Sequence, residues 1–133
     1  MRPVLVIAAA EAVGGNRQEI LPFAVATEYI HTYTLIHDDL PALDNDDLRR
    51  GKPTNHKVFG EAIAILAGDA LLTQAFYLMT HSELMSEVPP RKLLQAAHEM
   101  TVAIGSSGMI GGQVVDIESE GKPIDAETLE YIH

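Results

Sequence analysis

Five aspartates lie within ten positions, between Asp38 and Asp47, and two arginines follow at Arg49 and Arg50. Carboxylates at this density repel one another, so a folded chain accommodates them only where they are solvated or share cations. Mg²⁺ prefers oxygen ligands and usually binds one or two carboxylates, while substrate phosphates fill other positions. The guanidinium fork of arginine fits phosphate oxygens. The segment therefore contains both halves of a site for a metal ion and a diphosphate.

Two other interpretations of this acidic run deserve comparison. Acidic runs are commonly solvated loops or interaction tails, but this run is interrupted by the apolar residues 40–43 and is flanked by apolar helical patterns. A calcium-binding EF-hand loop requires glycine at its sixth position and glutamate at its twelfth. Counted from Asp44, these positions are Arg49 and Asn55, which excludes a calcium loop of that type.

The composition predicts a helical protein with a core. Of the 133 residues, 47% are hydrophobic and only 5% are aromatic, with no tryptophan, so close-packed helices are favoured over a sheet sandwich. The net charge of −10 argues against nucleic acid as a partner, because such binding relies on Lys and Arg. No cysteine is available for a disulfide or a thiolate metal site. We expect no membrane span, because no run approaches the roughly 18 apolar residues that one needs.

The start of the chain loosely imitates a secretory signal, since Arg2 precedes an apolar segment that ends in Ala8-x-Ala10. The single charge, Pro3 directly after it and Glu11 inside the would-be cleavage region argue against a signal.

Hydrophobic spacing predicts six helices separated by breaker-rich segments. The segment 45–57 is rich in Gly, Pro and Asn and is expected to be a loop. The pattern over 60–84 is apolar almost all round, which predicts a centrally buried helix. Asp125 is a candidate N-cap residue, and Gly111-Gly112 are expected to allow close backbone approach. The expected helices cover residues 4–13, 17–38, 60–84, 90–106, 113–118 and a segment from 125 onward.

The order of the motifs resembles the trans-isoprenyl diphosphate synthases, a family of all-α prenyltransferases that includes farnesyl and geranylgeranyl diphosphate synthases. The bacterial form is matched by Asp38-Asp39-x-x-x-x-Asp44 and by Leu48-Arg49-Arg50-Gly51-Lys52-Pro53-Thr54. Further matches are Gly68-Asp69-Ala70-Leu71-Leu72, Gly108-Met109-x-Gly111-Gly112-Gln113-x-x-Asp116 and Arg2-Pro3. The resemblance implies an all-α fold, part of the isoprenoid-synthase helical bundle, with antiparallel helices around a central apolar cavity.

The resemblance also implies roles for individual residues. Asp38 and Asp44 are expected to bind Mg²⁺ that bridges to the diphosphate of an allylic substrate, with Asp39 supporting the cluster. Arg49 is expected to contact the allylic diphosphate, and these four residues are the expected catalytic group. Arg2, His31 and Arg50 are expected to bind isopentenyl diphosphate, while Gln113 and Asp116 lie near the same cavity in the family. His31 precedes Asp38 by about two helical turns, so the two side chains share one helix face.

Product length is expected to depend on Tyr33 and Thr34. Tyr33 matches the aromatic residue that closes the cavity in producers of fifteen-carbon chains, and Thr34 is small, as in bacterial farnesyl diphosphate synthases. An isolated tyrosine on an apolar helix is otherwise interpreted as a core residue.

The chain also departs from the family pattern. The lysine that precedes Arg2 in the family is absent, and no second aspartate-rich motif follows Asp116. We therefore expect residues 1–133 to form a partial isoprenyl synthase domain without prenyl-transfer activity of its own.

The predicted function of the intact protein is Mg²⁺-dependent condensation of dimethylallyl or geranyl diphosphate with isopentenyl diphosphate to give farnesyl diphosphate. We expect a cytoplasmic homodimer. The alternatives are a geranyl or geranylgeranyl diphosphate synthase, and a noncatalytic truncated homologue that acts as a scaffold subunit. A terpene cyclase shares an aspartate-rich motif, but the continuation Arg49-Arg50-Gly51-Lys52-Pro53 argues against it.

Overall fold

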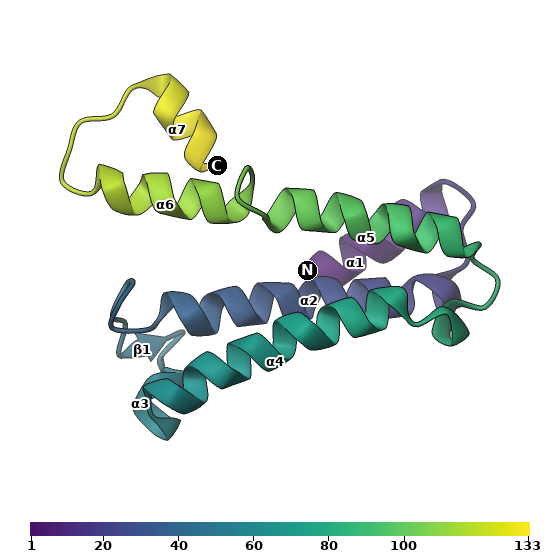
Figure 1. Cartoon of the computed structure of the whole chain (residues 1–133), viewed down its shortest axis with the longest axis horizontal. Coiled ribbons are helices and arrows are strands. Elements are labelled where there is room, and N and C mark those ends of the chain that lie inside the picture. The colour runs from purple at the N-terminus through teal and green to yellow at the C-terminus, as the bar shows by residue number, and fades with distance from the viewer. The chain divides into compact units, whose positions relative to one another are not determined.

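The computed structural model describes residues 1–133, and almost all of its regular structure is helical (Figure 1). The chain divides into two compact units, residues 1–93 and residues 94–133. The elements are α1 (Arg2–Ala12), α2 (Arg17–Asp38), β1 (Leu48–Arg49), β2 (Lys52–Pro53), α3 (Asn55–Phe59), α4 (Glu61–Thr80), the 3₁₀ helix η1 (Ser82–Met85), α5 (Pro90–Ile104), α6 (Met109–Ser119) and α7 (Ala126–Ile132). The predicted all-α class is confirmed.

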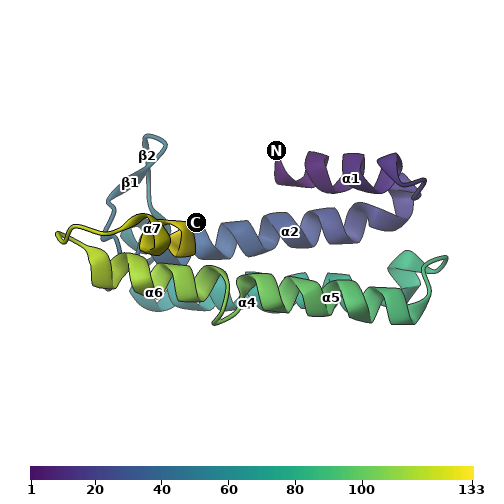
Figure 2. The same cartoon turned by 90° about the horizontal axis from the view of Figure 1, so that it is seen from above.

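Three antiparallel helices form most of the first unit. α2 lies between α1 and α4, and it runs in the opposite direction to both (Figure 2). α4 contributes small or flexible buried side chains to the packing of this unit, whereas α2 also buries the bulky Phe23, Ile30 and Tyr33. The buried apolar residues of these two helices are Phe23, Ala24, Ala26, Ile30, Tyr33, Ala64, Ala75 and Met79.

The predicted helix boundaries are mostly confirmed, and the best match is α2 itself. Its start is capped by the side chain of Asn16, which accepts a hydrogen bond from the backbone N–H of Gln18 at 2.8 Å. The prediction of a featureless loop over 45–57 was wrong, because this segment contains the β1–β2 hairpin and α3. Elements of two to five residues are too short to show a hydrophobic period, so the breaker residues dominated the pattern.

The environment of α4 differs from the prediction. The residues buried on α4 are the small or flexible Ala64, Gly68, Ala75 and Met79. Several of its larger apolar side chains are exposed, namely Ile63, Ile65, Leu66 and Tyr77, whereas Leu71, Leu72, Phe76 and Leu78 are half-buried. The expectation of a helix buried on every side was therefore wrong for this chain. Within the first unit, α4 has its main contacts with α2 and α3, and these leave the rest of its surface uncovered.

By length and mean hydropathy alone, α4 could cross a membrane, although polar residues interrupt its apolar run. The core helix of a soluble protein passes the same test of length and composition. α4 carries Glu61 and Asp69, and it packs its small residues against α2.

In the second unit, α6 and α7 pack against each other. Gly111 and Gly112 are both buried, and a side chain at Gly112 would press on the backbone of α7. The expected close backbone approach is thus confirmed. Asp125 caps α7 as predicted, since its carboxylate accepts a hydrogen bond from the backbone N–H of Thr128 at 2.8 Å. This bond holds the pKa of Asp125 below its ordinary value.

Candidate active site

The aspartate run begins in the last turn of α2 and turns back on itself directly after the helix. The backbone N–H of Asp44 donates to the carbonyl of Asp38 at 2.9 Å, and the N–H of Asn45 donates to the carbonyl of Leu40 at 3.1 Å. Leu40 is buried and anchors this turn. Asn45 has a left-handed backbone with φ of 54°, which asparagine tolerates better than most residues. The turn brings the backbones of Asp38 and Asp44 into direct contact.

The donor set of these two aspartates fits a hard metal ion. The side chain of Asp38 is 29% exposed, and Asp44 is exposed as well. No group of three or more His, Asp or Glu side chains converges in the arrangement of a complete metal site. Mg²⁺ commonly keeps several waters and binds one or two carboxylates together with substrate phosphates. The pair therefore suits Mg²⁺ that binds jointly with a diphosphate better than a metal held by protein ligands alone.

Arg49 enters this acidic cluster from the side of the hairpin. Its Nε donates to Oδ1 of Asp39 at 2.7 Å, and its Nη2 lies 2.6 Å from the same oxygen. Nη2 also lies 3.7 Å from Oδ2 of Asp38 and 3.9 Å from Oδ2 of Asp46. The hydrogen bond with Asp39 raises the pKa of Arg49 above its ordinary value. Arg49 is therefore surrounded by three carboxylates.

The turn of the hairpin separates the two neighbouring arginines. β1 and β2 are antiparallel, and Arg49 pairs with Lys52 across the two-residue turn Arg50–Gly51. Both turn residues have positive φ, 54° for Arg50 and 77° for Gly51. This combination defines a type I′ turn, which asparagine and glycine adopt most readily. Arg50 thus has a strained backbone and an exposed side chain, whereas Arg49 faces the carboxylates.

Four of the predicted substrate-binding residues lie in one electrostatic neighbourhood. The pKa of His31 is lowered, first by burial and then by the charge of Arg2, while Glu28 opposes this shift. The charges of Arg50 and Arg49 lower the pKa of His31 further. Cations carried by α1 and the hairpin therefore act on one histidine of α2, in a protein whose net charge is −10. A neutral imidazole among cations gains a proton more readily when an anion binds beside it.

Thr54 and His56, which the sequence analysis missed, hold the acidic loop from its other side. The hydroxyl of Thr54 donates to the carbonyl of Asp46 at 2.8 Å, and its backbone N–H donates to the carbonyl of Asp47 at 3.1 Å. Nδ1 of His56 lies 3.2 Å from this hydroxyl, and both residues are buried. A threonine directly before a helix is typical of an N-cap. Sequence alone does not show that its hydroxyl bonds to the loop instead.

His37, the residue before Asp38, fastens the end of α2 to α4. Its Nε2 lies 3.0 Å from the carbonyl of Ile65. The ring of Tyr33 meets it edge to face, with 5.6 Å between the ring centroids. A Cβ atom at Gly68 would overlap the ring of His37. Packing therefore explains why position 68 of the Gly68-Asp69 motif is a glycine, because any side chain there would occupy the space of the imidazole.

Tyr33 and Thr34, the residues expected to set product length, have different surroundings. Tyr33 is buried, and this burial raises the pKa of its phenol. The hydroxyl of Thr34 donates to the carbonyl of His31, one turn earlier, at 2.8 Å. The position of Tyr33 is compatible with a core residue and with a steric stopper, so its role in product length stays a prediction.

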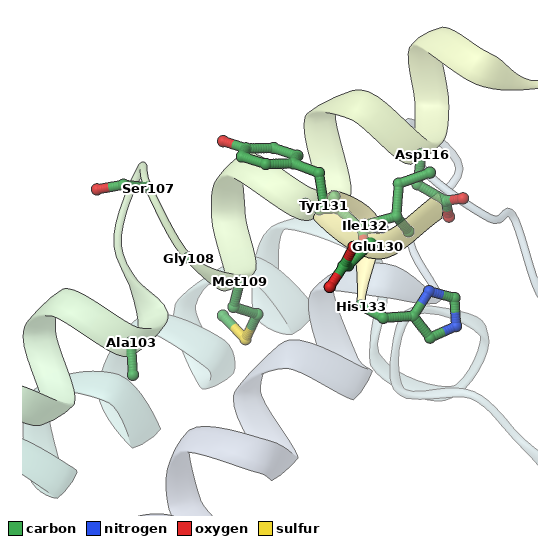
Figure 3. Close-up of a pocket in the computed structure, with 11 residues that line it drawn as sticks. Ala103, Ser107, Gly108, Met109, Asp116, Glu130, Tyr131, Ile132 and His133 are labelled. Atoms are coloured by element: carbon green, nitrogen blue, oxygen red, sulfur yellow. The ribbon is translucent and has the colours of Figure 1, made fainter. Parts of the chain in front are cut away.

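Gln113 and Asp116 lie on α6 in the second unit and share one helix face, as their spacing predicted. Both line a cavity of about 520 Å³ between α6, α7 and the end of α5 (Figure 3). Glu130 and His133 contribute further polar groups to its wall. The roles of Gln113 and Asp116 in substrate binding stay predictions.

The model of the polyprenyl synthetase family matches residues 1–133, the full length of the chain. The chain belongs to the polyprenyl synthetase family. This polyprenyl synthetase chain is 53% identical to farnesyl diphosphate synthase of Bacillus subtilis (strain 168) over 133 residues, which are 100% of this chain and 45% of that protein. It is 55% identical over 136 residues to the chloroplastic heterodimeric geranylgeranyl pyrophosphate synthase large subunit 1 of Arabidopsis thaliana, covering 100% of this chain and 37% of that protein.

Solved structures give the same result for the fold of the chain. A geranyltransferase from Legionella pneumophila has a TM-score of 0.94 and 40% sequence identity, and the match covers 100% of this chain and 47% of that chain. An FPP/GFPP synthase from Zymomonas mobilis has a TM-score of 0.92 and 41% identity, covering 99% of this chain and 48% of that chain. This polyprenyl synthetase chain spans less than half the length of these relatives and has the fold of their matching part.

Proposed function

We propose that the full-length protein carrying this chain is a Mg²⁺-dependent trans-prenyltransferase that condenses an allylic diphosphate with isopentenyl diphosphate. Two observations support the proposal. One is the Asp38–Asp44 turn at the end of α2. The other is that the charges of Arg2, Arg50 and Arg49 act on His31, which lies about two turns earlier on the same helix. A carboxylate pair that recruits a cation, next to a separate group of cations, suits two diphosphates bound side by side.

The proposed chemistry is ionisation of the allylic diphosphate, attack by the isopentenyl double bond and loss of a proton. When bound, Mg²⁺ supplies Lewis-acid stabilisation of the departing diphosphate. Asp38 and Asp44 would hold the ion, and Arg49 would donate to the same leaving group from a fixed position. Arg2, His31 and Arg50 would hold the isopentenyl diphosphate. Apolar side chains around Tyr33 would keep water from the allylic cation.

We propose farnesyl diphosphate as the product. Tyr33 is a bulky, buried residue close to the aspartates in sequence, and farnesyl diphosphate synthases from Bacillus subtilis and Geobacillus stearothermophilus are 53% and 54% identical to this chain. Geranylgeranyl diphosphate is the second candidate, because the heterodimeric geranylgeranyl pyrophosphate synthase large subunit of Arabidopsis is 55% identical.

We also propose a homodimer in the cytoplasm. The apolar side chains that α4 exposes, such as Ile63 and Leu66, support burial against a further protein surface. The polyprenyl synthetase relatives include bacterial farnesyl diphosphate synthases. The expectation that residues 1–133 alone lack prenyl-transfer activity stays a prediction, to be assayed beside the full-length protein.

A noncatalytic scaffold subunit is the competing proposal from another class. A scaffold function does not require two aspartates held together by a backbone hydrogen bond, or an arginine with a strained backbone. The half-buried Asp38, the exposed Asp44 and the left-handed backbone of Arg50 therefore favour the enzyme.

The test is turnover of the full-length protein with dimethylallyl diphosphate, isopentenyl diphosphate and Mg²⁺. Asp38→Asn is expected to lower turnover by at least about a hundredfold, because lost leaving-group stabilisation is worth several kcal/mol. Asp47→Asn is the matched control: it makes the same charge change in the same run, and Asp47 is exposed and pairs with Lys57 at 2.7 Å. Near-normal turnover of Asp38→Asn, or an equal loss in both variants, would contradict the proposal.

A further inference from the structure

We propose that Asp39 positions Arg49, and that this pair, in which the carboxylate of Asp39 is buried, keeps the acidic cluster folded before a metal ion binds. The inference rests on the proposed function, because it assigns the second aspartate of the run a part in the same site. Its basis is the contact of Nε and Nη2 of Arg49 with one oxygen of Asp39, at 2.7 Å and 2.6 Å.

Burial separates Asp39 from the aspartates on either side of it. The side chain of Asp39 is only 5% exposed, compared with 29% for its neighbour Asp38, and Asp44 is exposed. A Mg²⁺ ion keeps several waters and therefore needs ligands that solvent can reach. Asp38 and Asp44 meet this need, whereas Asp39 is buried and already accepts a hydrogen bond from Nε of Arg49, with Nη2 of the same guanidinium in an ion pair with it.

The position of Asp39 also requires a cation supplied by the protein. Asp39 is the C-cap residue of α2, where the negative end of the helix dipole disfavours a carboxylate. The carboxylate of Asp39 is also buried and follows Asp38 directly in the chain, so a cation in contact with it is stabilising. Arg49, on the first strand of the hairpin, is that cation.

The same guanidinium neutralises the outer carboxylates before metal arrives. Nη2 of Arg49 lies 3.7 Å from Asp38 and 3.9 Å from Asp46, distances at which the attraction is weaker than at Asp39. A metal ion that binds Asp38 can replace the first of these outer interactions while the inner pair stays intact. Arg49 would then keep one fixed direction in the empty and loaded protein. Its guanidinium has five N–H donors, and the hydrogen bond to Asp39 uses only the one at Nε.

The experiment compares Asp39→Asn, Asp38→Asn and Arg49→Lys in the full-length protein. Asp46→Asn is the matched control, because it removes one negative charge near Arg49 from a side chain that is 51% exposed. Three quantities are measured. They are the urea concentration at the midpoint of unfolding in the presence of EDTA, the number of Mn²⁺ ions bound per subunit with inorganic diphosphate, and KM for each substrate. Unfolding in EDTA does not depend on catalysis, so it tests the pair even if the proposed function fails.

A positioning role predicts that Asp39→Asn keeps the wild-type number of Mn²⁺ ions, whereas Asp38→Asn lowers it. Asp39→Asn should unfold earlier in EDTA than Asp46→Asn, and should raise KM for the allylic diphosphate at least tenfold with KM for isopentenyl diphosphate nearly unchanged. The double variant Asp39→Asn with Arg49→Lys should lose no more stability in EDTA, and raise KM for the allylic diphosphate no further, than the more severe single variant.

Loss of one Mn²⁺ ion in Asp39→Asn would overturn the inference. It would also be overturned if the increases in KM of the two single variants multiplied in the double variant. Equal stability of Asp39→Asn and Asp46→Asn in EDTA would also overturn it. Absence of prenyl transfer in the wild-type protein, with a normal stability difference in EDTA, would refute the proposed function and leave the Asp39–Arg49 pair established.

Discussion

The strained turn at Arg50 allows a change that should stabilise the protein and weaken its function together. Arg50 has φ of 54° at the first central position of a type I′ turn. A left-handed backbone costs an ordinary L-residue roughly 1–2 kcal/mol, whereas asparagine before glycine is the preferred pair for this turn. We therefore expect Arg50→Asn to raise the free energy of unfolding by roughly 0.5–1 kcal/mol, since asparagine removes part of the strain.

The same substitution should weaken substrate binding. Arg50 contributes positive charge beside His31, and a hydrogen bond to a charged group is worth about 1.5–3 kcal/mol. A loss of that size corresponds to an increase of about ten- to a hundredfold in KM for isopentenyl diphosphate. Arg50→Ala is the matched control, because alanine removes the guanidinium but keeps a Cβ atom in the left-handed conformation.

Urea unfolding and steady-state kinetics of the two variants measure both effects. Arg50→Asn should be more stable than the wild type and than Arg50→Ala, and both variants should show the same rise in KM. If the two variants unfold at the same urea concentration, the argument from backbone strain is refuted. If KM for isopentenyl diphosphate does not change, Arg50 is not part of that binding site.

Three further predictions follow from the packing around α2. Gly68→Ala should lower the free energy of unfolding by about 1–3 kcal/mol, because its methyl group would overlap the ring of His37; equal urea midpoints would contradict this. Burial and Arg2 lower the pKa of His31 below 6.5, so the unfolded chain binds this proton more readily and stability falls as the pH drops through that value. Thermal unfolding of His31→Gln should show a shallower loss on acidification, and an unchanged pH profile would refute the assignment. Tyr33→Ala should shift products to longer chains in mass spectrometry, and an unchanged product would exclude Tyr33 as the stopper.

Local signals were sufficient to predict much of the framework of the site. The cap at Asn16 and the periodicity up to Asp38 determine the extent of α2, and both depend on neighbouring residues alone. The acidic run was recognised from its composition, whereas the turn that returns the chain from Asp38 to Asp44 was found only in the structure.

Contacts between distant segments were not predictable in the same way. The pairing of Arg49 with Asp39 depends on a two-residue turn, and no hydrophobic period marks strands as short as β1 and β2. The hydroxyl of Thr54 donates to a carbonyl of the acidic loop and makes no capping bond with the helix that follows it. For α4, apolar composition indicates a tendency to be buried but does not identify the surfaces that cover it.

The central claim is that a divalent ion bridges Asp38, Asp44 and an allylic diphosphate. Crystals of the full-length protein grown with Mn²⁺ and an allylic thiodiphosphate test it directly, because the anomalous signal of Mn²⁺ locates the ion. We expect an anomalous peak within bonding distance of both carboxylates and of a phosphate oxygen. A bound diphosphate with no metal beside Asp38 and Asp44 would contradict the account.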